Sequence, residues 1–404
     1  MKNIIKVSTF VAIAALLSLK SAAQTISPIK DATGKYGFTI ANVYFEVNPA
    51  LGGRITSLKI DTTQILYLAT LNQPNGSDNA GSTFWPSPQS VWNWPPPLAL
   101  NYSAYKVLSS EGKLAIQSSV DATTKLYFGK IFTANTADTS ITIQYIIKNT
   151  NTTAKTWAPW EITRVNNSGL SFFGIGSGSI YGNPSDDMSK RAKVINKVGW
   201  YVQDSTKTIS GSKFFCDGAG WFAHKTNSGY LFIKKFADIT KASAAPGEAE
   251  VECYTATGSY TELEDQGAYV SIAAGDSVIW QVKWFVRKLP ANIKGYSGDK
   301  NLLNFVYKTM NPDTSFSIIK IAQDSPFEVF PNPVLDKLMI TNQSGFIKNT
   351  VAEIYDLQGQ LLLRENLANN QSNLDFTSFT SGAYLLQISG KDNQRLFTKM
   401  IVKK

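Results

Sequence analysis

The stretch Ser140–Lys148, SITIQYIIK, decides the fold, because apolar and polar side chains alternate along most of its length. A period of two is typical of an antiparallel strand with one buried face. The stretch Val278–Val286, VIWQVKWFV, repeats the pattern. On the first stretch, the side chains predicted to share the buried face are Ile141, Ile143, Tyr145 and Ile147. Both stretches therefore predict strands of a large sheet.

Similar runs with turn residues between them recur along the chain, which predicts strands rather than helices. They include Gly37–Val47, Arg54–Ile60, Lys113–Val120, Thr124–Phe132, Tyr230–Phe236 and Glu248–Thr255. An ordinary seven-stranded sandwich needs only about 100 residues. We therefore predict an all-β fold, with a large antiparallel β super-sandwich over residues 24–290 and a small C-terminal β-sandwich over residues 325–404. Residues 291–324 are predicted to form a finishing strand and a linker.

The N-terminus has the three parts of a secretory signal peptide. Lys2 and Lys6 are basic, Val11–Leu19 is a short apolar run, and the small residues Ser21 and Ala23 follow. A spanning helix needs about 20 apolar residues, more than this run provides. We expect residues 1–23 to be removed, and we expect no transmembrane segment in the mature chain.

Composition limits the classes of ligand. The formal net charge is +9, but the basic residues are dispersed and form no Lys/Arg run. This pattern favours a solvated basic surface over a nucleic-acid site, and it leaves an anionic glycan open. The sequence contains a single histidine and no CxxC motif, so we expect no metal site. We also expect no cofactor, because no phosphate-binding loop is visible.

The two cysteines, Cys216 and Cys253, stand in strand-like segments. An exported protein can form a disulfide, although spacing alone does not prove one. We expect the two residues to lie close together, either bonded or as two free buried thiols.

The last eighty or so residues carry four ordered motifs. They are Pro331-Asn332-Pro333, Tyr355-Asp356 with Gly359, Ser381-Gly382-Ala383-Tyr384, and the basic end Lys403-Lys404. In this order the motifs closely resemble the C-terminal sorting domain of the type IX secretion system of Bacteroidetes, and the resemblance covers residues 325–404. It implies passage through the outer membrane to the cell surface or medium, with the secretion machinery as partner.

Two motifs carry a second resemblance. Leu51-Gly52-Gly53-Arg54-Ile55 opens a strand, and Ala273-Ala274-Gly275-Asp276-Ser277 leads into the stretch that ends at Val286. Both are similar to motifs of the galactose mutarotase-like (aldose 1-epimerase-like) superfamily, whose members are β super-sandwiches that bind sugars on one concave face. The phrases FWPSP at 84–88 and PWEITR at 159–164 resemble an uncharacterised bacterial branch of it.

The stretch FWPSPQSVWNWPPP packs tryptophans and prolines together, which predicts a rigid loop. Indole faces can stack on the C–H faces of a pyranose. Alternatively, the loop folds its tryptophans over the end of the sandwich as a local core. The residues that we predict to bind a ligand are Arg54, Trp85, Trp92, Trp94 and Arg164, with Arg54 taken from the hairpin that resembles the superfamily.

Glu161 and His224 are the predicted catalytic pair, since sugar epimerisation needs two proton-transfer groups. Each has a structural alternative, because Glu161 can simply pair with Arg164 and a lone histidine is often structural. The epimerases of the superfamily use a glutamate with several histidines, and this chain departs from that pattern. Carboxylates also alternate at Glu250 and Glu252 and at residues 262 and 264. Such residues more often form a solvated face than an acid pair.

We therefore expect a secreted carbohydrate-binding or carbohydrate-processing protein. Two alternatives stay open at this point. One is an aldose 1-epimerase-type enzyme that uses the Glu161–His224 pair, and the other is a structural cell-surface module without small-molecule chemistry.

Deleting residues 325–404 is expected to leave the large domain folded but retained in the periplasm, because the sorting motifs are lost. Cell fractionation with an immunoblot measures this. A truncated chain that reaches the medium as efficiently as the full chain would show that the sorting assignment is wrong.

Overall fold

The computed structural model describes residues 26–69, 79–182, 191–203, 211–256, 259–311, 327–342, 350–356, 360–367, 369–390 and 395–404. The predicted signal peptide lies outside these residues. The chain divides into two compact units, Met1–Phe316 and Ser317–Lys404.

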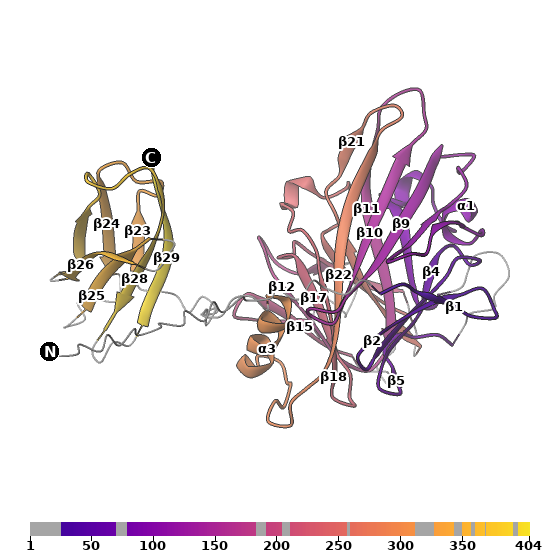
Figure 1. The fold of residues 1–404 in the computed structure, drawn as a ribbon, viewed down its shortest axis with the longest axis horizontal. Coiled ribbons are helices and arrows are strands. Elements are labelled where there is room, and N and C mark those ends of the chain that lie inside the picture. The colour runs from indigo at the N-terminus through magenta and orange to yellow at the C-terminus, as the bar shows by residue number, and fades with distance from the viewer. Residues whose placement is uncertain are drawn as a thin grey trace, which may run out of the picture. The chain divides into compact units, whose positions relative to one another are not determined.

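The first unit contains two large antiparallel sheets (Figure 1). In spatial order, the twelve-stranded sheet contains β1 (Ile29–Lys30), β2 (Tyr36–Ile40), β3 (Val43–Asn48), β4 (Arg54–Ile60), β6 (Ser82–Ser87), β11 (Lys155–Asn166), β20 (Tyr260–Gln266), β19 (Val251–Thr255), β16 (Ser212–Cys216) and β13 (Tyr181–Gly182). The short strands β5 (Thr63–Gln64) and β21 (Val270–Ile272) pair with β4 and β11.

The ten-stranded sheet lies against it. Its strands, in spatial order, are β14 (Lys193–Ile195), β15 (Val198–Gln203), β12 (Gly169–Gly174), β17 (Trp221–Lys225), β18 (Tyr230–Lys235), β22 (Ser277–Lys288), β10 (Ser140–Asn149), β9 (Leu126–Asn135), β8 (Leu114–Gln117) and β7 (Lys106–Ser109). The long strands β9, β10 and β22 run side by side.

The main core lies between the two sheets, and the alternation in β10 and β22 builds it. Tyr145 faces Trp280 and Ile143 faces Val282 across the ladder, and all four side chains are buried. The intervening positions of β10 are only half-buried. The predicted all-β fold, including the buried face of β10, is confirmed.

The Gly-Gly hairpin before β4 is held by a close backbone approach. Gly52 has a φ of 62°, and a Cβ added there would lie 1.9 Å from the carbonyl oxygen of Asn101. The buried Lys130 Nζ donates to the carbonyl oxygens of Gly52 and Gly53 at 2.9 and 3.0 Å. Glycine is therefore required at position 52 by both space and backbone conformation.

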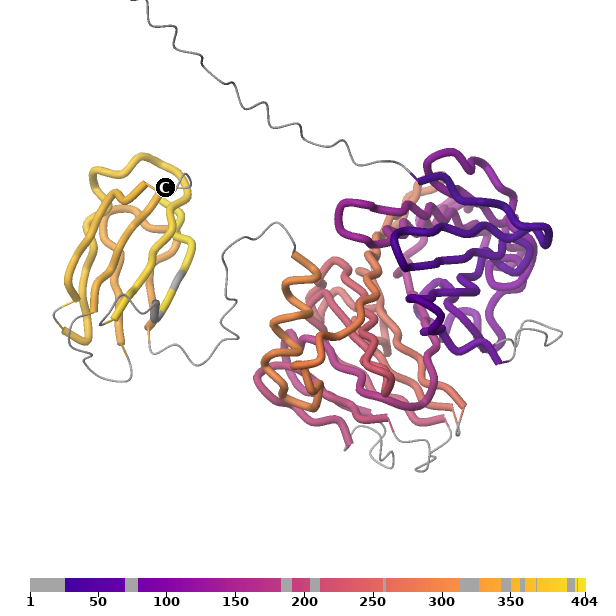
Figure 2. Tube along the Cα trace, turned by 60° about the horizontal axis from the view of Figure 1, so that its bottom comes forward, coloured from indigo at the N-terminus to yellow at the C-terminus, as the bar shows by residue number. Residues whose placement is uncertain are grey.

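The described part of the predicted finishing segment, residues 291–311, contains helix α3 (Lys300–Met310) and no strand, and residues 312–324 lie outside the described residues. Asp299 caps the helix by accepting from the amides of Asn301 and Leu302. Apolar residues at helical spacing face the sheet, and the ring of Tyr307 packs edge-on against Trp221 of β17, 5.8 Å between centroids. Figure 2 shows α3 in orange beside the strands of the ten-stranded sheet.

The other helical segments are single turns, namely η1 (Gln89–Val91), α1 (Leu98–Asn101) and η2 (Lys241–Ser243). No helix in the described part of the chain is long and apolar enough to cross a membrane.

The second unit is a small β-sandwich with its own core. One sheet contains β23 (Phe327–Phe330), β24 (Lys337–Asn342) and β27 (Gln371–Asp375); the other contains β26 (Leu361–Leu367), β25 (Thr350–Tyr355), β28 (Gly382–Ser389) and β29 (Arg395–Lys403). Leu338, Ile354 and Leu386 are among its fully buried residues. Pro331 and Pro333 lie between β23 and β24. Gly359 of the second tail motif lies outside the described residues.

Cys216 and Cys253 lie on the neighbouring strands β16 and β19. Cys216 faces Val251 and Cys253 faces Phe214, so the two cysteines are diagonal neighbours on one face of the sheet. Diagonal positions lie about 7–8 Å apart, beyond the usual Cα separation of a disulfide. Both are free, buried thiols, which is the second of the two expected states.

Without reductant, the folded chain is expected to resist iodoacetamide at both cysteines. Burial raises the pKa of Cys216 to about 12 and holds that of Cys253 well above its usual value, so the reactive thiolate is scarce. After unfolding in guanidinium, mass spectrometry should find both cysteines alkylated. A chain that accepts no label even when unfolded would contain a disulfide and would contradict this structure.

Candidate functional site

Strand β11 carries two of the predicted site residues, and its pleat sends them to opposite faces of the twelve-stranded sheet. Glu161 faces Phe84 and Asp265 across the ladders, whereas Arg164 faces Glu262. The three-residue spacing requires this in a regular strand. Phe84 belongs to the main core, so Glu161 points between the sheets and Arg164 points to the outer face, away from the ten-stranded sheet.

Glu161 is fully buried in the main core. Its Oε1 accepts a hydrogen bond from the hydroxyl of Tyr145, on β10 of the opposite sheet, at 3.0 Å. Ser82 Oγ donates to the same oxygen at 3.3 Å. Burial raises the pKa of Glu161, although the Lys234 ammonium acts in the other direction. A ligand on the outer face cannot touch this carboxyl.

Arg54 is also fully buried, and its Nη1 donates to the carbonyl oxygen of Ala80 at 3.3 Å. Burial lowers the pKa of Lys130 to about 7, and the positive charge of Arg54 contributes to this decrease. The structure therefore places Arg54 inside the protein, next to the lysine that holds the Gly-Gly hairpin.

His224 belongs to the ten-stranded sheet. Its Nδ1 lies 3.1 Å from Ser171 Oγ, which in turn accepts from Gln203 Nε2 at 2.7 Å. Burial lowers the pKa of His224 to about 3, so the ring is neutral. His224 and Glu161 thus sit in separate hydrogen-bond networks, and neither reaches the outer face that carries Arg164.

The outer face of the twelve-stranded sheet arranges side chains in rows that cross the strands. The first row contains Arg164, Glu262, Tyr254 and Lys213. The second row contains Thr83, Ile162, Glu264, Glu252, Phe215 and Tyr181. The third row begins with Trp85, Trp160 and Gln266. We call Arg164, Lys213, Glu252, Glu262 and Glu264 the outer-face cluster.

Ion pairs and hydrogen bonds join the outer-face cluster. Arg164 Nε lies 2.8 Å from Glu262 Oε1, and Arg164 Nη1 donates to Thr83 Oγ1 at 3.1 Å. Lys213 Nζ lies 2.9 Å from Glu264 Oε2 and also pairs with Glu252. Each charge of the outer-face cluster thus pairs with an opposite charge on another strand of the sheet.

Carboxyl groups outnumber cations in the outer-face cluster. Burial, reinforced by Glu264, raises the pKa of Glu262 to about 7, although Arg164 acts the other way. Burial also raises the pKa of Glu252 well above its ordinary value despite Lys213. A carboxyl that titrates near neutral pH can donate or accept a proton in catalysis.

Solvent reaches the outer-face cluster at two points. The Lys213 side chain is 21% exposed and that of Glu262 is 11% exposed, whereas the side chains of Arg164 and Glu252 are fully buried. A ligand on this face would meet Lys213 and Glu262 directly, and the buried members would hold these two in position.

The predicted tryptophans gather beside the outer-face cluster. The ring of Trp85 packs edge-on against those of Trp92, Trp94 and Trp160, with centroids 5.3–5.9 Å apart. The Arg164 guanidinium lies 5.6 Å from the Trp85 ring centroid. Trp85 is buried, as a local core requires, whereas Trp94 is 50% exposed.

Contacts of the indole N–H groups orient this aromatic group. Trp85 donates to Asn101 Oδ1 at 2.8 Å, and Trp160 donates to Glu264 Oε2 at 2.9 Å. Trp160 therefore links the aromatic group to the outer-face cluster.

The prediction that FWPSPQSVWNWPPP is entirely a loop is wrong at its start, because Ser82–Ser87 forms β6. Pro86 lies opposite Pro159 of β11, so the missing amide donors of the two strands coincide at one step of the ladder. Trp92 and Trp94 follow in the turn-rich segment after β6, as predicted.

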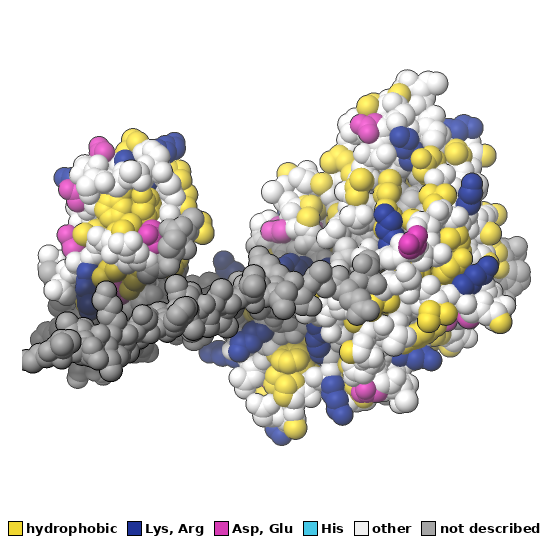
Figure 3. All heavy atoms as spheres, viewed as in Figure 1, with side chains coloured by type: hydrophobic (Ala, Val, Ile, Leu, Met, Phe, Trp, Pro, Cys, Tyr) yellow, Lys and Arg dark blue, Asp and Glu magenta, His cyan; other side chains and the backbone are white. Residues whose placement is uncertain are grey.

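Sequence reasoning missed the most informative residues. The alternating glutamates Glu262 and Glu264 were expected on a solvated face but are buried, because Arg164, Lys213 and Trp160 cover and pair with them. No sequence pattern marked Lys213 as a site residue, since a lysine in a strand usually faces water. Figure 3 shows such dispersed Lys and Arg side chains on the face in view.

The comparisons with known proteins fit this division of the chain. Residues 328–403 match the model of the secretion system C-terminal sorting domain, which the tail motifs predicted. This domain directs the chain through type IX secretion to the cell surface or the medium. Over 58 residues the chain is 33% identical to funoran endo-beta-hydrolase from Wenyingzhuangia aestuarii; the match covers 14% of this chain and 8% of that protein's length.

The structural neighbours include galactose mutarotase-like proteins, the superfamily that the sequence motifs resemble. One, from Clostridium acetobutylicum, has a TM-score of 0.48 at 10% identity and covers 66% of this chain and 99% of its own. Another, from Lactobacillus casei, has a TM-score of 0.45 at 10% identity and covers 63% of this chain and 100% of its own.

Replacing Glu262→Gln is expected to flatten the pH dependence of stability. In the folded chain its pKa is about 7, above the ordinary 4.5. The stability that the protonated carboxyl gives is fully present below pH 4.5 and is lost as the pH rises to about 7. Urea unfolding should show a smaller decrease for the variant across this window, by on the order of 1–3 kcal/mol. Glu111→Gln, at an exposed position, is the matched control. Parallel curves for Glu262→Gln and the unmodified chain would contradict the raised pKa.

Proposed function

We propose that this chain is a secreted carbohydrate-binding protein whose ligand lies on the outer face of the twelve-stranded sheet, over the outer-face cluster and Trp94. One observation carries the proposal. A buried set of paired charges opens to solvent at Lys213 and Glu262, next to a half-exposed indole.

The chemistry of this face suits a polyhydroxylated ligand. Carboxylates accept and ammonium groups donate hydrogen bonds, so Glu262 and Lys213 together can hold neighbouring hydroxyls. The exposed ring of Trp94 offers an apolar surface to the C–H face of a sugar. Because buried ion pairs and indole contacts fix the polar groups, little ordering is needed when the ligand binds.

Carbohydrate processing is the second candidate, and the pKa of Glu262 favours it. Glu262 and Glu264 are two residues apart on one strand, so both side chains stand on the same face of the sheet. Glycosidases use a pair of carboxyl groups, one of them as a proton donor. Glu262, with a pKa of about 7, would be that donor. The Glu161–His224 pair gains no support from its position.

A structural surface module remains the contrasting hypothesis, since it would also bury Trp85 and Trp160. It gives no reason for the exposed Trp94 or for carboxyl groups in excess of cations at a solvent-accessible point. Export by the sorting domain brings this face into contact with extracellular glycans, which supports a ligand there.

A glycan array followed by calorimetry on the full chain tests this proposal. Trp94→Ala is expected to weaken binding of any selected glycan by about tenfold or more, because a stacking surface is lost. Tyr296→Ala removes a similarly exposed ring elsewhere and is the matched control. For a processing enzyme, Glu262→Gln should lower turnover by roughly 10²–10⁴-fold. If every glycan bound by the unmodified chain binds Trp94→Ala and Glu262→Gln equally well, the ligand face is misplaced.

A further inference from the structure

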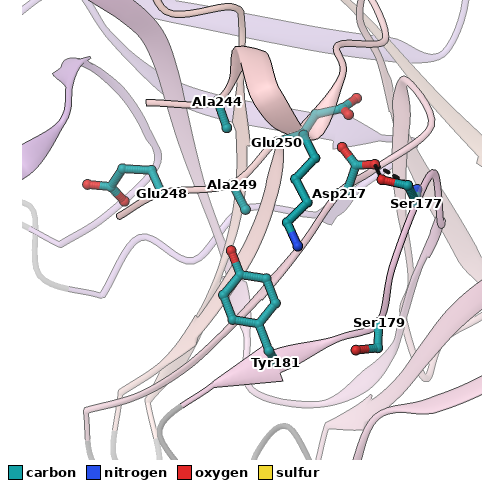
Figure 4. Close-up of a pocket in the computed structure, with 9 residues that line it drawn as sticks. Ser177, Ser179, Tyr181, Asp217, Ala244, Glu248, Ala249 and Glu250 are labelled. Carbon is teal, nitrogen blue, oxygen red and sulfur yellow. Dashed lines mark hydrogen bonds between the residues drawn. The ribbon is translucent and has the colours of Figure 1, made fainter. Parts of the chain in front are cut away.

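A narrow cavity that opens to solvent, with room for about one water-sized group, lies at the far end of the same face, beyond Lys213. Figure 4 shows its lining side chains. Asp217 and Glu250 stand on one side and Tyr181 on another, and the carboxyl of Glu248 points away from the group. Lys241 also lines the cavity, with its Nζ 5.8 Å from the ring centroid of Tyr181.

The two carboxyl groups are neighbours because of the strand register. Cys216 and Val251 form the last pair between β16 and β19, and Asp217 and Glu250 come one residue beyond it on either strand. Asp217 is 7% exposed and Glu250 is 1% exposed. Two carboxyl groups buried side by side are costly unless something donates to them or carries a compensating charge.

Each carboxyl is only partly satisfied. Asp217 Oδ2 accepts from the amide and the hydroxyl of Ser177, both at 2.6 Å, and Glu250 Oε1 accepts from the amide of Gly220 at 3.0 Å. Asp217 Oδ1 and Glu250 Oε2 are buried and accept no hydrogen bond from the described residues. Two acceptors on adjacent side chains thus line the cavity without a donor.

The ionisation of Glu250 depends on what occupies the cavity. Burial raises the pKa of Glu250 to about 8, and nearby carboxyl groups raise it too, although hydrogen bonds from the amides of Gly220 and Ile239 act in the other direction. Lys241 is the cation that lines the cavity, and it is exposed at the mouth. A positively charged occupant would lower the pKa of Glu250 and let both carboxyl groups accept hydrogen bonds in their ionised form.

We infer that this cavity binds the protonated primary amine of an amino sugar. An ammonium group brings N–H donors for Asp217 Oδ1 and Glu250 Oε2, and its positive charge favours the ionised form of both carboxyl groups. A neutral hydroxyl would bring a donor but no charge. Calcium would need about six to eight oxygen ligands.

The position of the cavity suggests what carries the amine. Glu250 lies two residues from Glu252 of the outer-face cluster, on the same side of β19. The ring of Tyr181 stacks on that of Phe215, 5.5 Å between centroids, and Lys213 Nζ lies 5.3 Å from the Phe215 ring. The cavity thus continues the proposed glycan face. The inference of an amine depends on the cavity alone, whereas the inference that a sugar carries the amine depends on the proposed function.

Calorimetric titration of the full chain with glucosamine, glucose and N-acetylglucosamine tests the inference. Glucosamine is expected to bind, and the two sugars without a free amine should bind at least about tenfold more weakly, since each loses a charge-assisted hydrogen bond. Asp217→Asn and Glu250→Gln should each weaken glucosamine binding by roughly 10- to 100-fold. Lys241→Met, at an exposed position, should strengthen it by removing the competing cation.

The matched control is Tyr296→Ala, which removes an exposed ring elsewhere and should leave glucosamine binding unchanged. Equal binding of glucose and glucosamine would overturn the amine site. So would unchanged glucosamine binding in both single variants, Lys241→Met and Asp217→Asn. Calcium binding that Asp217→Asn abolishes, with no amine binding, would overturn it as well. Methylammonium binding as tightly as glucosamine would overturn the sugar carrier. If the unmodified chain binds glucosamine but no glycan of the array on the main face, this would count against the proposed function and not against this cavity.

Discussion

From Trp157 to Val165 strand β11 is buried on both faces, so the charges of Glu161 and Arg164 must find their partners inside the protein. An unpaired buried charge costs several kcal/mol, and this requirement fixes the neighbours of the strand. On the inner face, Glu161 accepts from Tyr145 of the opposite sheet. Next to it, Asp265 pairs with Lys234, which also donates to the Leu263 carbonyl oxygen at 2.8 Å. These polar contacts tie the two sheets together across an otherwise apolar core.

On the outer face, the need to pair buried charges produces a charged surface that solvent can reach. Arg164 of β11 pairs with Glu262 of β20, and Lys213 of β16 pairs with Glu264 of β20 and Glu252 of β19. These four strands therefore contribute to one charged surface. Because the buried members are held by their neighbours, the groups that reach solvent are positioned before any ligand arrives. The raised pKa of Glu262 is a consequence of this crowding and burial.

The sequence predicted the fold where one face of a strand is buried and the other is not, as in Ser140–Asn149. It could not predict which way Glu161 points, because β11 is buried on both sides and its apolar residues show no alternation. The tail motifs identified the sorting domain, since their order is specific. Helix α3 was missed because its apolar face is short. The contact of Lys213 with Glu264 became visible only in the structure, because the two residues lie on strands separated by β19.

The central claim is that the ligand face is the outer face of the twelve-stranded sheet and not the region around Glu161 and His224. A crystal structure of the full chain with an oligosaccharide selected from the array tests it most directly. The account predicts sugar density in contact with Lys213, Glu262 and Trp94, with no contact to Glu161. Sugar bound against the ten-stranded sheet near His224, or reaching Glu161 through an opened sandwich, would contradict it.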